Sequence, residues 1–354
     1  MRLRVVIAAG GTAGHVVPAL AVAEALRADG HHVVFVGGER AEAELVPAAG
    51  FELRAISVRG LSRTNPFAAA AAGALAARAT AAAARILKAE RADAVLGGGG
   101  YVAGPVGLAA VARRVPLVLQ EADSHLGVTN RLLARFAHRV CLAFPLEGRT
   151  GDRYLVTGRP VPPPATDLAA ARARFGLGEA KRMVLVFGGS LGARSINEAA
   201  IAAFDDVPYR VLHAAGRRDY EALKARVPGP HYRLEPYLDR FGEALLAADL
   251  AVARAGGSVF EIASHGTPAI LVPYPHATAD HQTGNARWME RGGAAVVLPD
   301  DQITPERLRR EVDALLDDPA RLAAMATASA ALARPDAAER IAREVVAAAR
   351  GSGA

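Results

Sequence analysis

Short apolar runs alternate with alanine-rich stretches along nearly the whole chain, and this alternation constrains the fold more than any other feature. The runs are almost continuous in Val, Ile and Leu, which predicts strands that are buried on both faces. Strands that alternate with helical stretches indicate an α/β protein with parallel sheets covered by helices. The strand-like runs are LRVVIAAG, HVVFVGG, LRAISV, AVLGGG, PLVLQE, RVCLAF, YLVTG, MVLVFGG, YRVLHAAG, LAVARAGG, PAILVPY and AAVVLP.

A proline-rich stretch near the middle of the chain, TGRPVPPPATD, predicts a linker because proline interrupts both helices and sheets. The length of 354 residues suits two domains. Each half opens with a strand, a glycine loop and a helix, so we expect two Rossmann-like domains facing each other across a cleft. The predicted parts are a first domain at 1–157, a linker at 158–167, a second domain at 168–335, and a C-terminal helix at 336–354 that packs back on the first domain.

Charge and cysteine content narrow the range of partners and sites. Lys and Arg number 42 against 36 Asp and Glu, with a pI near 9.8, which fits a nucleotide, a lipid pyrophosphate or an anionic membrane face without choosing among them. The single cysteine, Cys141, excludes a disulfide within the chain and is expected in the core.

Residues 67–87 are mostly alanine and carry two arginines, so they fall short of a membrane-spanning helix. With no signal peptide before the first strand, we expect a cytoplasmic protein.

Three glycine loops follow predicted strands: GGTAGH, GGGGYVAGP and GGSLGARS. Glycine permits a close approach of backbone to ligand, and the free N–H groups of a following helix favour phosphate. Each loop alone could be a tight turn. None has the spacing of a P-loop or of a dinucleotide fingerprint, so neither an NTPase nor a nicotinamide oxidoreductase is favoured.

Five blocks together resemble a known family: GGTAGHVVPALAVAEAL, GGGGYVAGPVGLAA, LQEADSHLGVTNRLLA, GGSLGARSINEA and RAGGSVFEIASHGTPAILVPYPHATADHQTGNA. Their order and spacing are similar to those of the bacterial N-acetylglucosaminyltransferases that make lipid II. The resemblance covers the chain from Val5 to about Pro299. It implies a GT-B fold, a UDP-GlcNAc-dependent hexosyltransferase, and a role in peptidoglycan synthesis.

In that family, the C4 hydroxyl of the muramoyl sugar of lipid I attacks the anomeric carbon of GlcNAc, with inversion, and UDP departs. The resemblance therefore implies UDP-GlcNAc and undecaprenyl-pyrophosphoryl-MurNAc-pentapeptide as substrates, with no metal and no cofactor. It also implies peripheral attachment to the cytoplasmic face of the plasma membrane, an anionic membrane surface as partner, and contacts with other cell-wall synthesis proteins. No nucleic acid is expected.

The resemblance assigns most donor contacts to the second domain. Ser190 matches a donor-contacting residue and could equally be an N-cap, while Glu261 matches an acid that binds the ribose hydroxyls. Pro162 stands where the family carries an arginine, and Arg159 could either substitute for it at the donor phosphates or be a linker arginine in solvent. The donor set is Thr12, Gly14, Asp123, Arg159, Ser190, Gly257, Ser258, Glu261, His281, Gln282 and Asn285.

The acceptor and the catalytic base are assigned to the first domain. His15 is a candidate base because histidine titrates near neutral pH, although it could instead cap a helix or orient the diphosphate. Glu121 and Asp123 are rival bases, and the choice among the three stays open. The acceptor set is Gly11, Gly14, His15, Gly99, Gly100, Tyr101 and Asn130.

The segment 58–88 is the candidate membrane face. Basic residues beside apolar ones suit an anionic leaflet, whereas an ordinary alanine-rich surface helix is the alternative. The residues concerned are Arg59, Leu61, Arg63, Phe67, Leu75, Arg78, Arg85 and Lys88.

Three other functions compete with lipid II synthesis. The same fold could use another lipid or small-molecule acceptor. A UDP-GlcNAc 2-epimerase has a related fold but would need a different set of acidic residues. A UDP-sugar sensor would need the donor half without His15, Glu121 or the membrane face.

Overall fold

The computed structural model describes residues 2–58, 66–177, 181–189 and 192–351, except for the side chains of 66–74 and 278. The chain divides into two compact units. The first contains residues 1–161 and 334–354, and the second contains residues 162–333. The chain thus passes between the units after Val161 and before Arg334.

The first unit contains a seven-stranded parallel sheet in the order β3-β2-β1-β4-β5-β6-β7. Its strands are β1 (Arg4–Ala8), β2 (His32–Gly37), β3 (Glu52–Ala55), β4 (Ala94–Gly97), β5 (Leu117–Glu121), β6 (Arg139–Leu142) and β7 (Tyr154–Val156). Its helices are α1 (Ala13–Ala28), α2 (Ala41–Ala48), α3 (Pro66–Ala89), α4 (Ala103–Ala112), α5 (Val128–Leu133) with η1 (Ala134–Phe136), and α14 (Ala337–Gly351).

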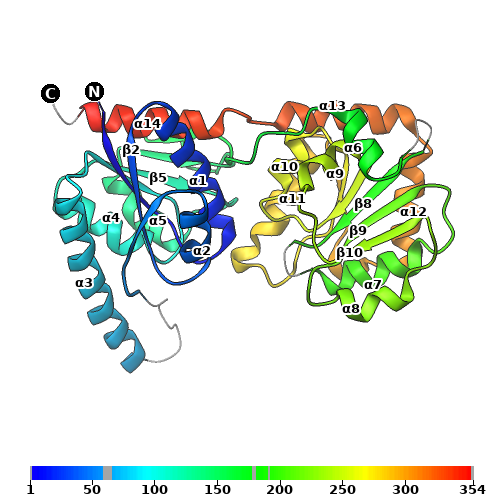
Figure 1. The fold of residues 1–354 in the computed structure, drawn as a ribbon, viewed down its shortest axis with the longest axis horizontal. Coiled ribbons are helices and arrows are strands. Elements are labelled where there is room, and N and C mark those ends of the chain that lie inside the picture. The colour runs from blue at the N-terminus through cyan, green and yellow to red at the C-terminus, as the bar shows by residue number, and fades with distance from the viewer. Residues whose placement is uncertain (1, 59–65, 178–180, 190–191, 352–354) are drawn as a thin grey trace. The chain divides into compact units, whose positions relative to one another are not determined.

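Helices cover both faces of this sheet (Figure 1). Side chains alternate along β1, so Val5 and Ile7 pack with α1, α2 and α14, while Val6 packs with α3, α4 and α5. The C-terminal helix α14 contributes Ile341 and Val345 to the first of these cores. Covering both faces explains why the strands are apolar without interruption.

The second unit contains a six-stranded parallel sheet in the order β10-β9-β8-β11-β12-β13. Its strands are β8 (Met183–Phe187), β9 (Arg210–Ala214), β10 (Tyr232–Glu235), β11 (Leu250–Ala253), β12 (Ala269–Leu271) and β13 (Ala295–Val297). Its helices are α6 (Leu168–Arg174), α7 (Arg194–Ala203), α8 (Tyr220–Leu223), η2 (Lys224–Arg226), α9 (Phe241–Ala247), α10 (Val259–Ser264), η3 (Thr278–Asp280), α11 (His281–Arg291), η4 (Asp300–Gln302), α12 (Pro305–Leu316) and α13 (Pro319–Leu332).

Both units are therefore Rossmann-like, which confirms the expected fold class. Strand β10 was missing from the predicted strands. It lies at the edge of its sheet and carries Arg233 and Glu235, so its sequence lacks the apolar run of a buried strand. Cys141 is fully buried on β6, as expected.

Candidate functional site

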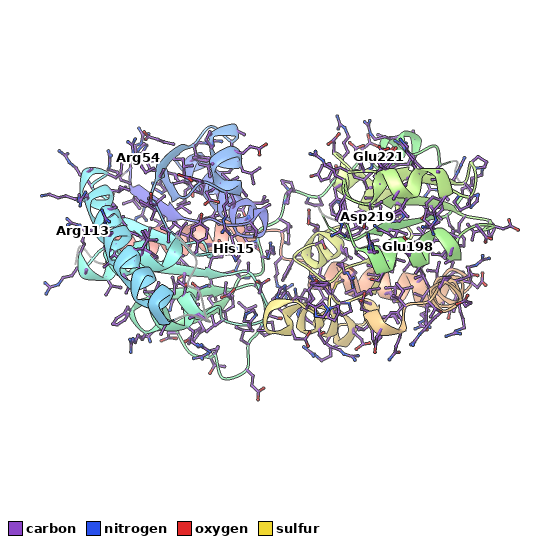
Figure 2. The ribbon with its side chains drawn as sticks, turned by 90° about the horizontal axis from the view of Figure 1, so that it is seen from below. His15, Arg54, Arg113, Glu198, Asp219 and Glu221 are labelled. Atoms are coloured by element: carbon purple, nitrogen blue, oxygen red, sulfur yellow. The ribbon has the colours of Figure 1, made fainter. Side chains whose placement is uncertain are left out.

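Most candidate residues of the first unit lie in the loops that follow β1, β4 and β5 or in the first turns of the helices after them, and Arg159 follows β7. Because the carboxyl ends of parallel strands share one edge, the three loops gather there. In Figure 2, His15 and Arg113 lie on opposite sides of the unit, since His15 follows β1 whereas Arg113 precedes β5. The sequence prediction thus selected residues from a single edge of the sheet.

His15 lies in the first turn of α1 and is half-buried. Its Nδ1 atom is 3.3 Å from Oγ1 of Thr12. The other side of the ring packs on the loop after β4, where a Cβ added to Gly99 would lie 2.6 Å from the His15 Cδ2. Gly99 also has a φ of +98°, so glycine is required there for two reasons. These contacts fix the orientation of the His15 ring.

Two predicted acceptor contacts have partners inside the protein. The amide of Gly11 donates to Oε2 of Glu42 at 2.8 Å, and the Tyr101 hydroxyl donates to Oε1 of the same carboxylate at 2.8 Å. Gly14 is exposed at the start of α1. Gly100 has a φ of +77°, and a Cβ there would overlap the carbonyl oxygen of Gly10. The glycines thus bring two loops into direct backbone contact.

Glu121 is a buried carboxylate that holds the loop after β5. Its oxygens accept from the amides of Gly127 and Asp123 at 2.9 and 3.3 Å, and from Nδ2 of Asn130 at 2.9 Å. Burial raises the pKa of Glu121, and the hydrogen bonds act in the opposite direction. Asn130 is itself buried and also donates to the Gln120 carbonyl. Asp123, by contrast, is half-buried.

Arg159 belongs to the first unit and is only 9% exposed. Its guanidinium donates to the carbonyls of Ala122 at 3.0 Å and Gly14 at 2.7 Å. Arg159 therefore joins the loop after β5 to the first turn of α1. That it binds donor phosphates stays a prediction.

The glycine loop of the second unit follows β8 and leads into α7. Ser190 falls outside the described residues. Gly192 has a φ of +79°, and a Cβ there would overlap the carbonyl oxygen of Ala215. At the start of α7, the Ser195 hydroxyl donates to Asp300 at 2.6 Å and accepts from Arg254 at 2.8 Å.

Arg254 at the end of β11 completes this network. It is 8% exposed and also donates to Asp300 at 2.5 Å and to the carbonyls of Val272 and Pro273. None of Arg254, Ser195 and Asp300 is among the site residues predicted from the sequence. The only available signal was that Arg254 is charged and directly follows an apolar strand.

The other donor candidates lie on α10, on α11 and in the loop before α10. Glu261 is half-buried in the first turn of α10, with Gly257 and Ser258 directly before the helix. His281 and Gln282 begin α11, and Oε1 of Gln282 accepts from the amide of Tyr274 at 3.0 Å. Asn285 is fully buried and donates to the Ala255 carbonyl at 2.9 Å, so it ties α11 to the loop before α10.

A buried polar chain supports the loops of the second unit. His213 on β9 is fully buried, with Nδ1 2.7 Å from the Tyr232 hydroxyl and Nε2 3.0 Å from Oδ1 of Asn197. Asn197 on α7 then donates to Ala215 and to Asp219. This chain connects the start of α7 to the ends of the strands beside it.

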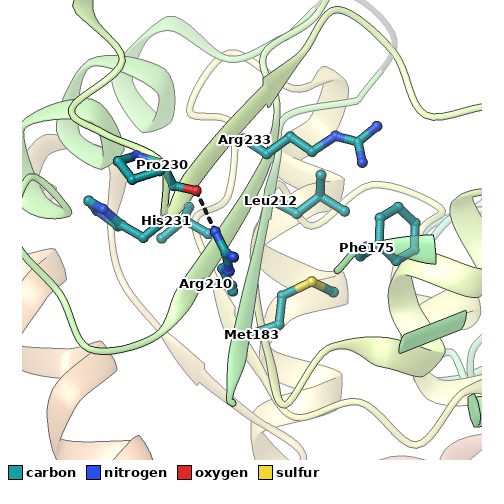
Figure 3. A pocket seen from close by; sticks show the side chains of 8 residues that line it. Phe175, Met183, Arg210, Leu212, Pro230, His231 and Arg233 are labelled. Carbon is teal, nitrogen blue, oxygen red and sulfur yellow. Dashed lines mark hydrogen bonds between the residues drawn. The ribbon is translucent and has the colours of Figure 1, made fainter. Parts of the chain in front are cut away.

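A hollow of about 120 Å³ lies at the opposite edge of the second sheet (Figure 3). Met183 and Arg210 begin strands β8 and β9 there, and Arg210 donates to the Pro230 carbonyl. Because none of the predicted donor residues lines this hollow, it is separate from the candidate site. Within the described residues, no three His, Cys, Asp or Glu side chains gather closely enough to hold a metal ion.

Comparisons with known proteins identify the family to which the two units belong. The glycosyltransferase family 28 N-terminal domain matches residues 5–142, and the glycosyltransferase family 28 C-terminal domain matches residues 183–341. The first match lies within the first unit, and the second covers most of the second unit and extends into the start of α14.

Full-length relatives narrow the family further. The UDP-N-acetylglucosamine–N-acetylmuramyl-(pentapeptide) pyrophosphoryl-undecaprenol N-acetylglucosamine transferase of Moorella thermoacetica is 41% identical over 96% of this chain and 97% of its own. The protein of the same name from Alkalilimnicola ehrlichii is 42% identical, over 97% and 98%. The crystal structure of Acinetobacter baumannii MurG matches with a TM-score of 0.81 and 32% identity, over 97% of this chain and 99% of that one. The chain therefore belongs to this N-acetylglucosamine transferase family within glycosyltransferase family 28.

Proposed function

We propose that the protein transfers GlcNAc from UDP-GlcNAc to the C4 hydroxyl of the muramoyl sugar of undecaprenyl-pyrophosphoryl lipid I, with inversion, to give lipid II for peptidoglycan synthesis. The observation that carries the proposal is the identity of 41–42% with relatives named for this transfer, over nearly the whole of both chains. The glycine loops at the strand ends of both units support it.

In this proposal the donor binds to the second unit. Its diphosphate lies at the start of α7, where the N–H groups of a first helical turn and the helix dipole favour an anion. The Glu261 carboxylate accepts hydrogen bonds from the ribose hydroxyls, as its half-buried position in the first turn of α10 permits. The leaving UDP is stabilised by these backbone groups, so we propose that the reaction needs no metal or cofactor.

The acceptor binds to the first unit, with its diphosphate at the exposed first turn of α1. We propose His15 as the base that removes the proton of the C4 hydroxyl. Its ring is partly accessible and is oriented by Thr12 and Gly99. Glu121 is a weaker candidate, because three donors already occupy its oxygens. Asp123 remains the alternative base.

We further propose that the first unit attaches to an anionic membrane surface at the cytoplasmic face, where the lipid acceptor lies. Arg59, Leu61 and Arg63 of the predicted face fall outside the described residues. On α3, Arg78, Arg85 and Lys88 are exposed. No helix within the described part of the chain is long and apolar enough to span a bilayer.

We also propose that exposed side chains of the neighbouring helices α4, α5 and η1 belong to this face. Leu108 on α4, Leu132 on α5 and Phe136 on η1 are 49%, 58% and 49% exposed. Arg131 and Arg135 are exposed on the same short helices. Exposed apolar side chains with basic side chains on the same helices suit an anionic lipid surface.

The proposal is tested by incubating the protein with UDP-GlcNAc and a lipid I analogue in EDTA and identifying products by mass spectrometry. Lipid II together with an equal amount of UDP is the expected result. If UDP is released only with a different acceptor, the protein is another glycosyltransferase. If a 2-epimer of UDP-GlcNAc forms without an acceptor, the protein is an epimerase. UDP binding without any turnover would indicate a sensor.

A further inference from the structure

Glu42 is a buried carboxylate in the first turn of α2 that the reaction as proposed does not use. Its Oε2 accepts from the amide of Gly11 at 2.8 Å. Its Oε1 accepts from the amide of Gly38 at 2.9 Å and from the Tyr101 hydroxyl at 2.8 Å. Burial acts to raise the pKa of Glu42, but these hydrogen bonds hold it below its usual value. The group is therefore a carboxylate at neutral pH.

The three donors come from three different loops, which follow β1, β2 and β4. The loops pack so closely around the carboxylate that glycine is needed at their contacts. A Cβ on Gly10 would lie 2.7 Å from Oε1 of Glu42, and a Cβ on Gly38 would overlap the Tyr101 hydroxyl. Glu42 is thus the common partner of the loop that carries His15 and the loop that carries Tyr101.

This arrangement changes the roles expected of Gly11 and Tyr101. The Gly11 amide and the Tyr101 hydroxyl donate to Glu42, so both donors are already satisfied within the protein. The Tyr101 ring also packs on the loop, because a Cβ on Gly11 would lie 3.5 Å from two ring atoms. What faces solvent is the following turn, in which Thr12 and Gly14 are exposed.

We propose that Glu42 is a positioning residue for acceptor binding: it sets the GGTAGH loop and Tyr101 so that the first turn of α1 and His15 meet the acceptor's diphosphate and hydroxyl. Glu42 acts through Gly11 and Tyr101 and does not touch the substrate. The inference rests on the proposed function, because it assumes that the acceptor binds at this loop.

The test uses the full chain with three variants: Glu42→Gln, Tyr101→Phe and Glu44→Gln. Glutamine at position 42 keeps the shape of the side chain, but its amide nitrogen cannot accept a hydrogen bond, so at least one of the three donors loses its acceptor. Phenylalanine at position 101 removes one of the three donors and keeps the ring. Glu44 is exposed on the same helix and serves as the matched control. Initial rates are measured with the acceptor and the donor varied separately, and UDP binding is measured by calorimetry.

We expect Glu42→Gln to lower kcat/KM for the lipid I analogue by about tenfold to a hundredfold, as for a catalytic loop displaced by a fraction of an ångström. The affinity for UDP should stay at the value of the unchanged protein, because the diphosphate and ribose contacts are proposed at the second unit. Tyr101→Phe should show a smaller loss of the same kind, and Glu44→Gln none.

Two results would overturn the inference. One is an unchanged kcat/KM for the acceptor in Glu42→Gln with UDP binding intact. The other is an equal loss in the acceptor and donor parameters together with a lowered Tm, which would make Glu42 merely structural. If Glu42→Gln does not fold, Tyr101→Phe decides by the same comparison. Absence of transfer by the unchanged protein would instead overturn the proposed function.

Discussion

Mild acid should destabilise the second unit through His213. This histidine is fully buried, and burial lowers its pKa from 6.5 to about 3. The Asn197 oxygen beside Nε2 requires a proton there, so Nδ1 is left to accept from the Tyr232 hydroxyl. A second proton on the ring would therefore face the Tyr232 donor in a fully buried site. The folded protein keeps His213 neutral where the unfolded chain protonates it.

The size of the effect follows from the two pKa values. Because the folded pKa is depressed, the stability is complete above the unfolded value of 6.5 and is lost as the pH falls toward about 3. Between about pH 7.5 and about pH 5.5, the difference in proton binding lowers the free energy of unfolding by about 1.4 kcal/mol.

The assay can report on the second unit alone. Trp288 on α11 is the only tryptophan of the chain, and its ring packs 5.1 Å from that of Phe260. Denaturant unfolding followed by its fluorescence should give the free energy of unfolding of this unit at both pH values. His213→Gln keeps a donor and an acceptor but cannot titrate, so it should remove about 1.4 kcal/mol of the pH dependence. His276→Gln, at an exposed histidine of the same unit, is the control.

The comparison isolates His213, because the other histidines contribute equally to the pH dependence of the free energy of unfolding in the unchanged protein and in His213→Gln. A His213→Gln protein that loses as much stability between the two pH values as the unchanged protein would refute the reasoning. The reasoning would also be refuted if His276→Gln, and not His213→Gln, removed this pH dependence of the free energy of unfolding. A constant offset at both pH values reflects altered packing and leaves the prediction standing.

The remaining predictions concern the substrates and the membrane. Glu261→Ala should weaken UDP binding by about tenfold to a hundredfold, the loss expected when a charged acceptor of two hydroxyls is removed; calorimetry with UDP checks it, and unchanged affinity would contradict it. His15→Ala should lower kcat by about 10²- to 10⁴-fold with UDP affinity retained; near-normal turnover would move the role of base to Asp123. Replacing Leu132 and Phe136 together by serine should reduce co-sedimentation with anionic vesicles several-fold, whereas equal binding by the variant would remove these residues from the membrane face.

The strands could be predicted because parallel strands that are buried on both faces appear in the sequence as continuous runs of apolar residues. β1 shows the principle, since Val5 and Val6 enter cores on opposite faces of one sheet. β10 was not predicted, because an edge strand has a neighbouring strand on one side only. It can therefore carry charged residues such as Arg233 and Glu235.

The individual site residues were harder to assign. Residue type and motif placed His15, Glu121 and Tyr101 at one edge of a sheet. They did not distinguish a residue that contacts the substrate from one that holds a loop in place. Glu121 supports its own loop, and Tyr101 donates to a carboxylate from another helix. Among Glu39, Glu42 and Glu44, nothing local distinguishes the buried one, because its partners are up to 59 residues away.

The transfer itself is tested most directly by the linkage of its product. The disaccharide formed from UDP-GlcNAc and a lipid I analogue can be isolated and its anomeric configuration and attachment site determined by NMR. Direct displacement of UDP by the C4 hydroxyl predicts a β-1,4 linkage. An α linkage, or attachment at another hydroxyl, would contradict the account.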